Sequence, residues 1–97
     1  MSDEADALRG KRAQEVLDNE VYADSYASVE AELINKWRDS RNPEDREQLH
    51  QFLMMLGKVQ NALETVMRTG EVAAAEIARK RSKAEQIGDV YTNRWAA

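Results

Sequence analysis

The sequence has no cysteine, one proline, four glycines and one histidine in 97 residues. Without cysteine it forms neither a disulfide framework nor a thiolate metal site, so folding does not depend on an oxidising compartment. The few prolines and glycines leave long uninterrupted segments, and a third of the residues are charged. No segment alternates apolar and polar residues as a half-buried strand does. This composition predicts an all-α protein.

Long hydrophobic runs are also missing. No apolar run approaches the length that spans a bilayer, and the N-terminal MSDEADALRGKR lacks the apolar centre of a signal peptide. We therefore expect a soluble, cytoplasmic protein with no membrane contact. A chain of this length forms at most one domain, residues 1–97, with a modest core.

The most regular segment lies between Leu49 and Gly70. Apolar residues recur there at alternating spacings of three and four, which is the pattern of an amphipathic helix. Leu53 and Met67 widen this apolar stripe to one side. The stripe consists of Leu49, Phe52, Leu56, Val59, Leu63 and Val66.

A second helix, about residues 20–38, precedes this segment and carries an aromatic-rich apolar face. Between the two, Asn42 suits an N-cap and Pro43 suits the first helical position. Because the connection is short, the two helices should run antiparallel. Counting outward from the turn pairs Tyr26 with Leu56. We therefore expect an antiparallel helical hairpin, residues 20–38 against 43–69, whose facing apolar residues form the core.

Weaker patterns at both ends predict further helices. A helix over residues 3–19 has a thin apolar face weakened by Gly10, and Asn19 can end that helix or cap the next. Thr69-Gly70 predicts a stop, with Gly70 in the left-handed cap position. An alanine-rich helix over residues 71–88 and an aromatic tail over residues 89–97 should follow.

One alternative to the stop at Gly70 stays open. Ile77 and Ala84 continue the spacing of the stripe, so the third helix can extend past Gly70.

Catalytic and metal-binding patterns are absent from the sequence. His50 is the only histidine, lies on the solvent side of the stripe and has no acid–base partner at a suggestive spacing. Acidic residues cluster near Pro43, but a helix start explains them through the helix dipole. The isolated glycines form no phosphate loop. We therefore expect no enzyme, no cofactor, no metal and no small-molecule ligand.

Basic residues gather near the C-terminus. Charge is uneven along the chain: residues 1–47 hold thirteen acidic and seven basic residues, and residues 48–97 hold five and seven. A nucleic-acid contact is the functional interpretation of the basic cluster. The favoured interpretation is a solvated face, because the charges spread around the helix and Glu76 and Glu85 lie at helical spacings. The basic cluster is Arg79, Lys80, Arg81 and Lys83.

Part of the stripe has no partner in the expected hairpin. In the pairing above, Tyr22 reaches only Val59, so the stripe beyond Val59 stays uncovered by the second helix. A contiguous wet apolar patch is uncommon in a soluble monomer. We therefore predict a homo-oligomer or a place in a larger assembly. The candidate contact residues are Leu63, Val66, Met67, Ile77, Tyr91 and Trp95.

Four short segments resemble small bacteriophage and prophage proteins. They are Ala13–Tyr22 (AQEVLDNEVY), Ile34–Trp37 (INKW), Glu44–Leu49 (EDREQL) and Thr69–Gly70. The resemblance spans roughly the middle two-thirds of the chain and rests on packing and capping residues. It implies a viral origin and a virion or assembly role inside the host cell, and it transfers no catalytic or binding residue.

The sequence as a whole favours a structural or assembly protein that associates with itself or with a phage structural protein. Two alternatives remain. One is a nucleic-acid-associated packaging or regulatory protein that uses the basic cluster, whose affinity would fall steeply with salt. The other is a small inhibitor of a host protein, which would be recovered bound to one host partner.

Overall fold

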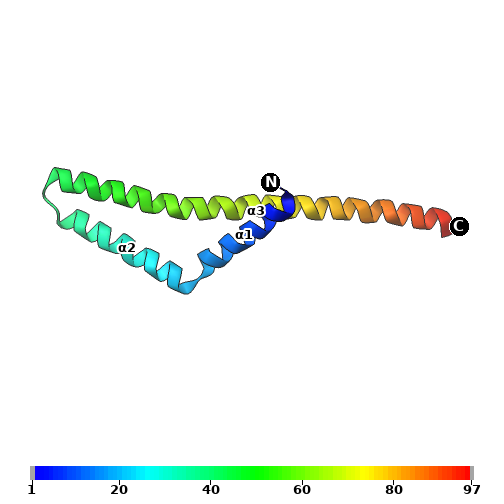
Figure 1. The fold of residues 1–97 in the computed structure, drawn as a ribbon, viewed down its shortest axis with the longest axis horizontal. Helices are drawn as coiled ribbons and strands as arrows, with labels where there is room; N and C mark the ends of the chain where they lie inside the picture. The colour runs from blue at the N-terminus through cyan, green and yellow to red at the C-terminus, as the bar shows by residue number, and fades with distance from the viewer. Residues whose placement is uncertain (1, 97) are drawn as a thin grey trace.

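The computed structural model describes residues 2–96, with side chains described as far as Gly88. This part of the chain forms three helices and no strand, so the all-α prediction is confirmed. Helix α1 covers Asp3–Asp18, α2 covers Glu20–Asp39 and α3 covers Pro43–Ala96. Helix α3 has 54 residues and determines the 83 Å length of the molecule. Helices α1 and α2 follow one another along the same side of α3, and the three outline a triangle (Figure 1).

Asparagine side chains set the helix boundaries, as the sequence predicts. The Asn19 side-chain oxygen accepts a hydrogen bond from the Tyr22 amide at 2.9 Å, and the Asn19 amide donates to the Val16 carbonyl at 3.1 Å. Asn19 therefore ends α1 and also caps α2. The Asn42 side chain likewise accepts from the Glu44 amide at 2.9 Å, directly before α3 begins.

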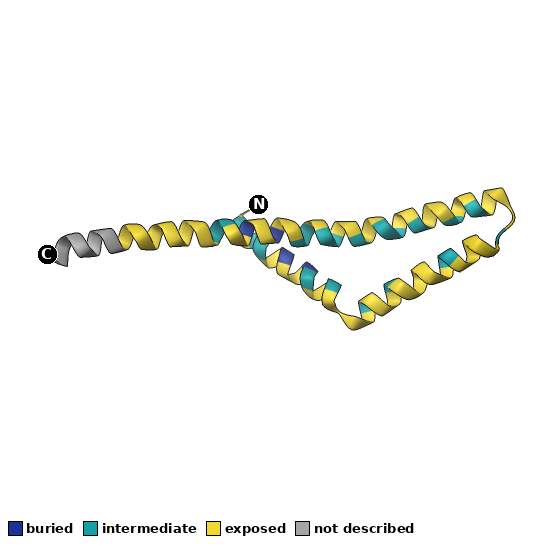
Figure 2. Cartoon of the chain, turned by 180° about the vertical axis from the view of Figure 1, so that it is seen from behind, coloured by how far each residue is buried: buried dark blue, intermediate teal, exposed yellow. Residues whose placement is uncertain are grey.

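The molecule is much more extended than a compact domain. Its radius of gyration is 22.8 Å, whereas a compact chain of this length has about 12.5 Å. Its accessible surface is 7802 Å², against about 5,650 Å² for a compact monomer of this mass. Ala13 and Ala73 are the only buried apolar side chains among the described residues. Both lie where α1 crosses α3 (Figure 2), so the small core is at that crossing.

Two glycines make the crossing possible. Gly10 of α1 and Gly70 of α3 face each other, and a Cβ built on either would lie 2.5 Å from the Cα of the other. A Cβ on Gly70 would also lie 2.9 Å from the Asp6 carbonyl oxygen. The obstacle in each case is backbone, which cannot move aside as a flexible side chain does. The two backbones are therefore closer than any residue with a side chain allows.

The expected stop at Gly70 is wrong. Helix α3 continues through Gly70, and no described glycine has a positive φ. The open alternative, continuation past Gly70, is the one observed. A glycine in a helix interior costs about 1 kcal/mol relative to alanine, and at Gly70 the contact with α1 offsets this cost. The separate helix expected over residues 71–88 is accordingly part of α3.

Helices α2 and α3 are antiparallel, and they contact each other through Trp37 and Arg46 near the turn and through two tyrosine hydroxyl groups farther from it. The Tyr26 hydroxyl donates to the Leu56 carbonyl at 3.1 Å, so the pairing expected from the sequence is present. One turn away along α2, the Tyr22 hydroxyl donates to the Gln60 side-chain oxygen at 3.3 Å. The two tyrosine rings lie 6.2 Å apart.

The α2–α3 pair does not form the main core that the sequence predicts. Val29, Phe52 and Val59 remain 45%, 48% and 51% exposed. Helix α1 packs more extensively on α3 than α2 does. The physical reason is the glycine crossing, which holds α1 tightly on α3 while α2 diverges from α3 toward Asn19 (Figure 1).

We predict opposite effects for alanine at two helical glycines. Gly10→Ala should lower the free energy of unfolding by about 1–3 kcal/mol, because the new Cβ pushes the two backbones apart. Gly57→Ala is the matched control, since a Cβ there meets nothing within 4 Å. It should raise the free energy of unfolding by about 1 kcal/mol. Urea unfolding followed by circular dichroism measures both; equal stabilisation by the two substitutions would contradict the crossing.

A second prediction concerns the tyrosine contact and pH. The pKa of Tyr26 lies above its usual value of 10.0, first because burial removes solvent and then because of nearby Glu30, Tyr22 and Glu64. The folded state thus favours the neutral phenol. Its stabilising contribution is complete below pH 10 and is lost as pH rises through the folded-state pKa. Tyr26→Phe should therefore flatten the fall in unfolding free energy above pH 10. An unchanged pH profile in this variant would contradict the assignment.

Candidate interaction surfaces

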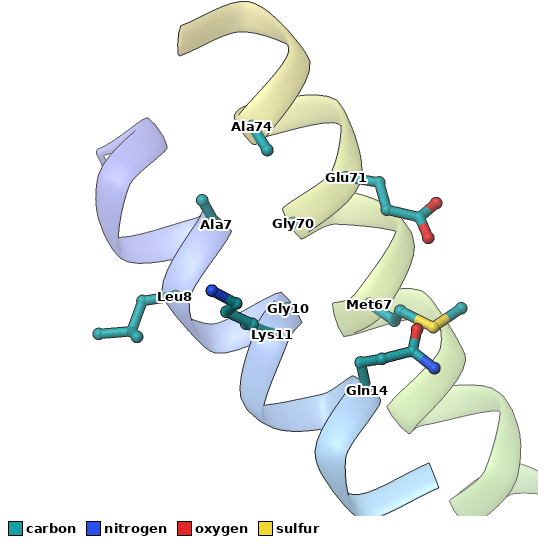
Figure 3. A pocket seen from close by; sticks show the side chains of 9 residues that line it. All are labelled: Ala7, Leu8, Gly10, Lys11, Gln14, Met67, Gly70, Glu71 and Ala74. Carbon is teal, nitrogen blue, oxygen red and sulfur yellow. The ribbon is translucent and has the colours of Figure 1, made fainter. Parts of the chain in front are cut away.

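The α1–α3 crossing leaves a groove on one side. Its floor is built from small residues, Ala7 and Gly10 of α1 and Gly70 and Ala74 of α3. Leu8 borders it on the α1 side, and Met67 and Glu71 project on the α3 side (Figure 3). The groove is apolar along most of its length. Lys11 and Gln14 of α1, together with Glu71, are its polar lining residues.

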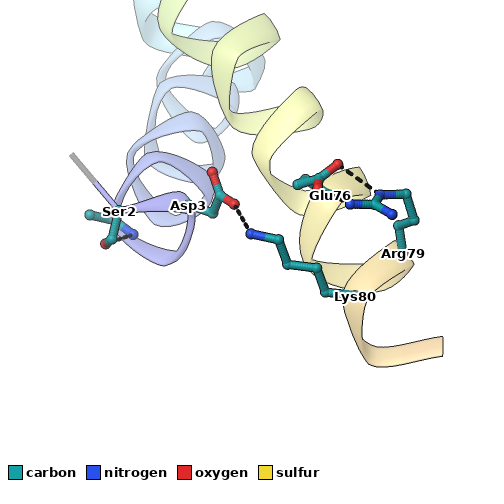
Figure 4. Close-up of polar contacts among 6 residues, drawn as sticks. Ser2, Asp3, Glu76, Arg79 and Lys80 are labelled. Carbon is teal, nitrogen blue, oxygen red and sulfur yellow. Dashed lines mark hydrogen bonds and ion pairs between the residues drawn. The ribbon is translucent and has the colours of Figure 1, made fainter. Parts of the chain in front are cut away.

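Two of the four basic-cluster residues are engaged within the chain. The Lys80 ammonium lies 3.4 Å from the Asp3 carboxylate, which links the start of α1 to α3 (Figure 4). Arg79 donates two hydrogen bonds to the Glu76 carboxylate, at 3.1 and 2.5 Å. The Arg79 hydrogen bond lowers the pKa of Glu76, and the same bond raises the pKa of Arg79.

Helix α3 continues beyond the crossing without α1 or α2 alongside it (Figure 1). We call the described part of this extension, 81–88, the arm. Arg81 and Lys83 are exposed there and take part in none of the ion pairs found among the described residues. Ile87 is 50% exposed. The arm therefore offers an apolar position beside positive charge.

Exposed apolar residues also lie along one side of the α2–α3 pair. Tyr26 of α2 faces Leu56 of α3. On α2, the residue three positions after Tyr26 lies to one side of this contact. On α3, the residue four positions before Leu56 and the residue three positions after it lie to the same side. Val29, Phe52 and Val59 occupy these positions. Met55 is exposed on the same side of α3. We call these four residues the α2–α3 flank.

The predicted contact residues have different environments. Leu63, Val66, Met67 and Ile77 are half-buried, because α1 turns back over this part of α3. The sequence leaves this part of the stripe without cover from the second helix, and in the structure it is the first helix, α1, that covers it in part. Tyr91 and Trp95 lie outside the described side chains. The assignment of these six residues to an interface stays a prediction.

Sequence reasoning missed the roles of Gly10 and Gly70. It took the first as a weakness in a helix and the second as a helix stop. The available signal was that each glycine is followed three residues later by an alanine, Ala13 and Ala73. Small residues one turn apart on two helices allow their backbones to approach closely.

Groups of other functional classes do not come together in the described part of the chain. His, Asp and Glu residues there form no cluster of three that could hold a metal ion. His50 is exposed at the start of α3. No described helix combines the length and the apolarity that crossing a membrane requires.

We predict a small but unequal effect of neutralising the basic cluster. Lys80→Gln removes the ion pair with Asp3 and should lower the free energy of unfolding by no more than about 1 kcal/mol, since the pair is exposed. Arg81→Gln, on the arm, should leave the free energy of unfolding unchanged at concentrations where the chain is monomeric. Denaturant titrations at low salt measure both; a larger loss from Arg81→Gln than from Lys80→Gln would contradict this division.

Comparison with known proteins gives no relative. No protein-family model, no curated protein and no solved structure matches the chain. The geometry of the three helices and of their exposed faces is therefore the basis for proposing a function.

Proposed function

We propose that this protein is a non-enzymatic assembly protein that acts through helical association, with a second copy of itself as the first partner. The observation that carries the proposal is the amount of apolar surface left exposed. Eleven large apolar side chains of the described residues are exposed, on all three helices. Isolated exposed apolar residues are ordinary, but contiguous ones indicate a contact surface.

The surface area supports association of this kind. The chain exposes 7802 Å², about 2,100 Å² more than a compact monomer of its mass. A standard protein interface buries about 800 Å² on each partner, and obligate interfaces bury more. The excess surface is therefore large enough for an obligate interface, or for more than one standard contact per chain.

The resemblance to small phage proteins extends the proposal to a virion or assembly component, with a phage structural protein as a further partner. Inhibition of a host protein by the same surfaces is the alternative within protein binding. Nucleic-acid binding through the basic cluster is favoured only by Arg81 and Lys83, because Arg79 and Lys80 pair with acidic residues of the chain. A nucleic-acid complex would weaken steeply as salt rises.

We expect the purified chain to self-associate. Sedimentation velocity over a range of concentrations should give a mass above the 11.1 kDa of one chain, rising with concentration. The fraction of helix, measured by circular dichroism, should rise in parallel, because an isolated helical extension is marginal in water. A strict monomer at the highest concentration reached, with unchanged helix content, would contradict self-association.

A further inference from the structure

One face of α3 is covered in the middle and open at both ends. Ile77 follows Val59 by eighteen residues, five turns of helix, and Ala84 follows it by twenty-five, close to seven turns. The three residues therefore share a face. Helix α1 covers this face around Gly70 and Ala73, which are buried. Val59 lies before the covered part, and Ala84 and Ile87 lie after it; all three are exposed.

The two open ends cannot cover each other within one chain. Val59 and Ala84 belong to the same continuous helix, and twenty-five residues correspond to about 37 Å of rise. Bringing the arm onto the α2–α3 flank would require α3 to break. A contact between these surfaces therefore joins two molecules.

The charges of the two surfaces are complementary. The arm, 81–88, contains two basic residues, Arg81 and Lys83, and one acidic residue, Glu85, a net charge of +1. Helix α2, beside the flank, contains five acidic and two basic residues, a net charge of −3. Two arms would repel each other, and so would two α2 helices. Arm against flank is the pairing that brings opposite charges together.

From the open face and its charges we infer that the arm of one molecule docks on the α2–α3 flank of a second copy. Ile87 and Ala84 supply the apolar contact to Phe52, Met55 and Val59 of the second copy, and Arg81 and Lys83 lie toward its acidic α2. The inference rests on the proposed self-association and names its surfaces. Because the two surfaces differ, the contact is head-to-tail, so it grows into an open chain of molecules unless the geometry closes a ring.

A mixing experiment tests the head-to-tail contact. Ile87→Asp disables the arm but keeps the flank, and Val59→Asp disables the flank but keeps the arm. Each variant alone should lose association at concentrations where the natural chain associates. Mixed together, they should form a pair of two chains and nothing larger, because one intact arm meets one intact flank. Sedimentation velocity distinguishes these species, and circular dichroism verifies that each variant is helical.

Two further variants test the role of the arm's charge and the specificity of the effect. The double variant Arg81→Glu, Lys83→Glu keeps good helix formers in the arm but reverses its charge. On its own it should not associate, and mixed with the Val59→Asp variant it should form a pair. Val72→Gln is the control, because Val72 of α3 is 70% exposed beside the start of α1, outside both surfaces, and a neutral side chain adds no charge next to Asp3 and Asp6. This control should associate as the natural chain does.

Three outcomes would overturn the inference. Association of either single variant would show that another surface is used, and failure of the mixture to form a pair would exclude arm against flank. In both cases the natural chain still self-associates, so the proposed function survives. A natural chain that stays monomeric would overturn both.

Discussion

The backbone contact between Gly10 and Gly70 is the interaction on which the rest of the structure depends. It brings α1 against α3 where no side chain intervenes, and the buried residues Ala13 and Ala73 lie beside it. The Met67 carbonyl oxygen lies on the side of Gly10 where a Cβ would stand, and the Asp6 carbonyl oxygen does the same at Gly70. A chain with so little buried apolar surface gains much of its tertiary packing from this one close approach.

The same contact explains what remains open. With α1 held tightly on the middle of α3, the α1–α2 junction at Asn19 lies away from α3. Helix α2 contacts α3 through Trp37 near the turn and through the hydroxyl groups of Tyr26 and Tyr22 farther from it. One side of the α2–α3 pair then stays exposed, and α3 extends past the crossing without a neighbour. The molecule is therefore elongated, with exposed apolar residues before and after the crossing.

The all-α fold and the first residues of α2 and α3 could be predicted from the sequence. Asn19, Asn42 and Pro43 carry local capping signals that act within a few residues. The pairing of Tyr26 with Leu56 also followed, since a short turn leaves little freedom of register. The glycine crossing was not predicted, because a glycine followed three residues later by an alanine permits close helix packing but does not exclude a helix end at the glycine. Only its partner sixty residues away decides between the two, and the mistaken stop at Gly70 has this origin.

Native-state hydrogen exchange of backbone amides tests most directly whether the crossing is the core. If it is, the most slowly exchanging amides will lie in α1 and α3 around Gly10 and Gly70, and those around Tyr26 and Leu56 will exchange faster. The measurement should be made at the lowest practical concentration, so that contacts between molecules contribute least. Slowest exchange at Tyr26 and Leu56, with rapid exchange throughout α1, would contradict the account.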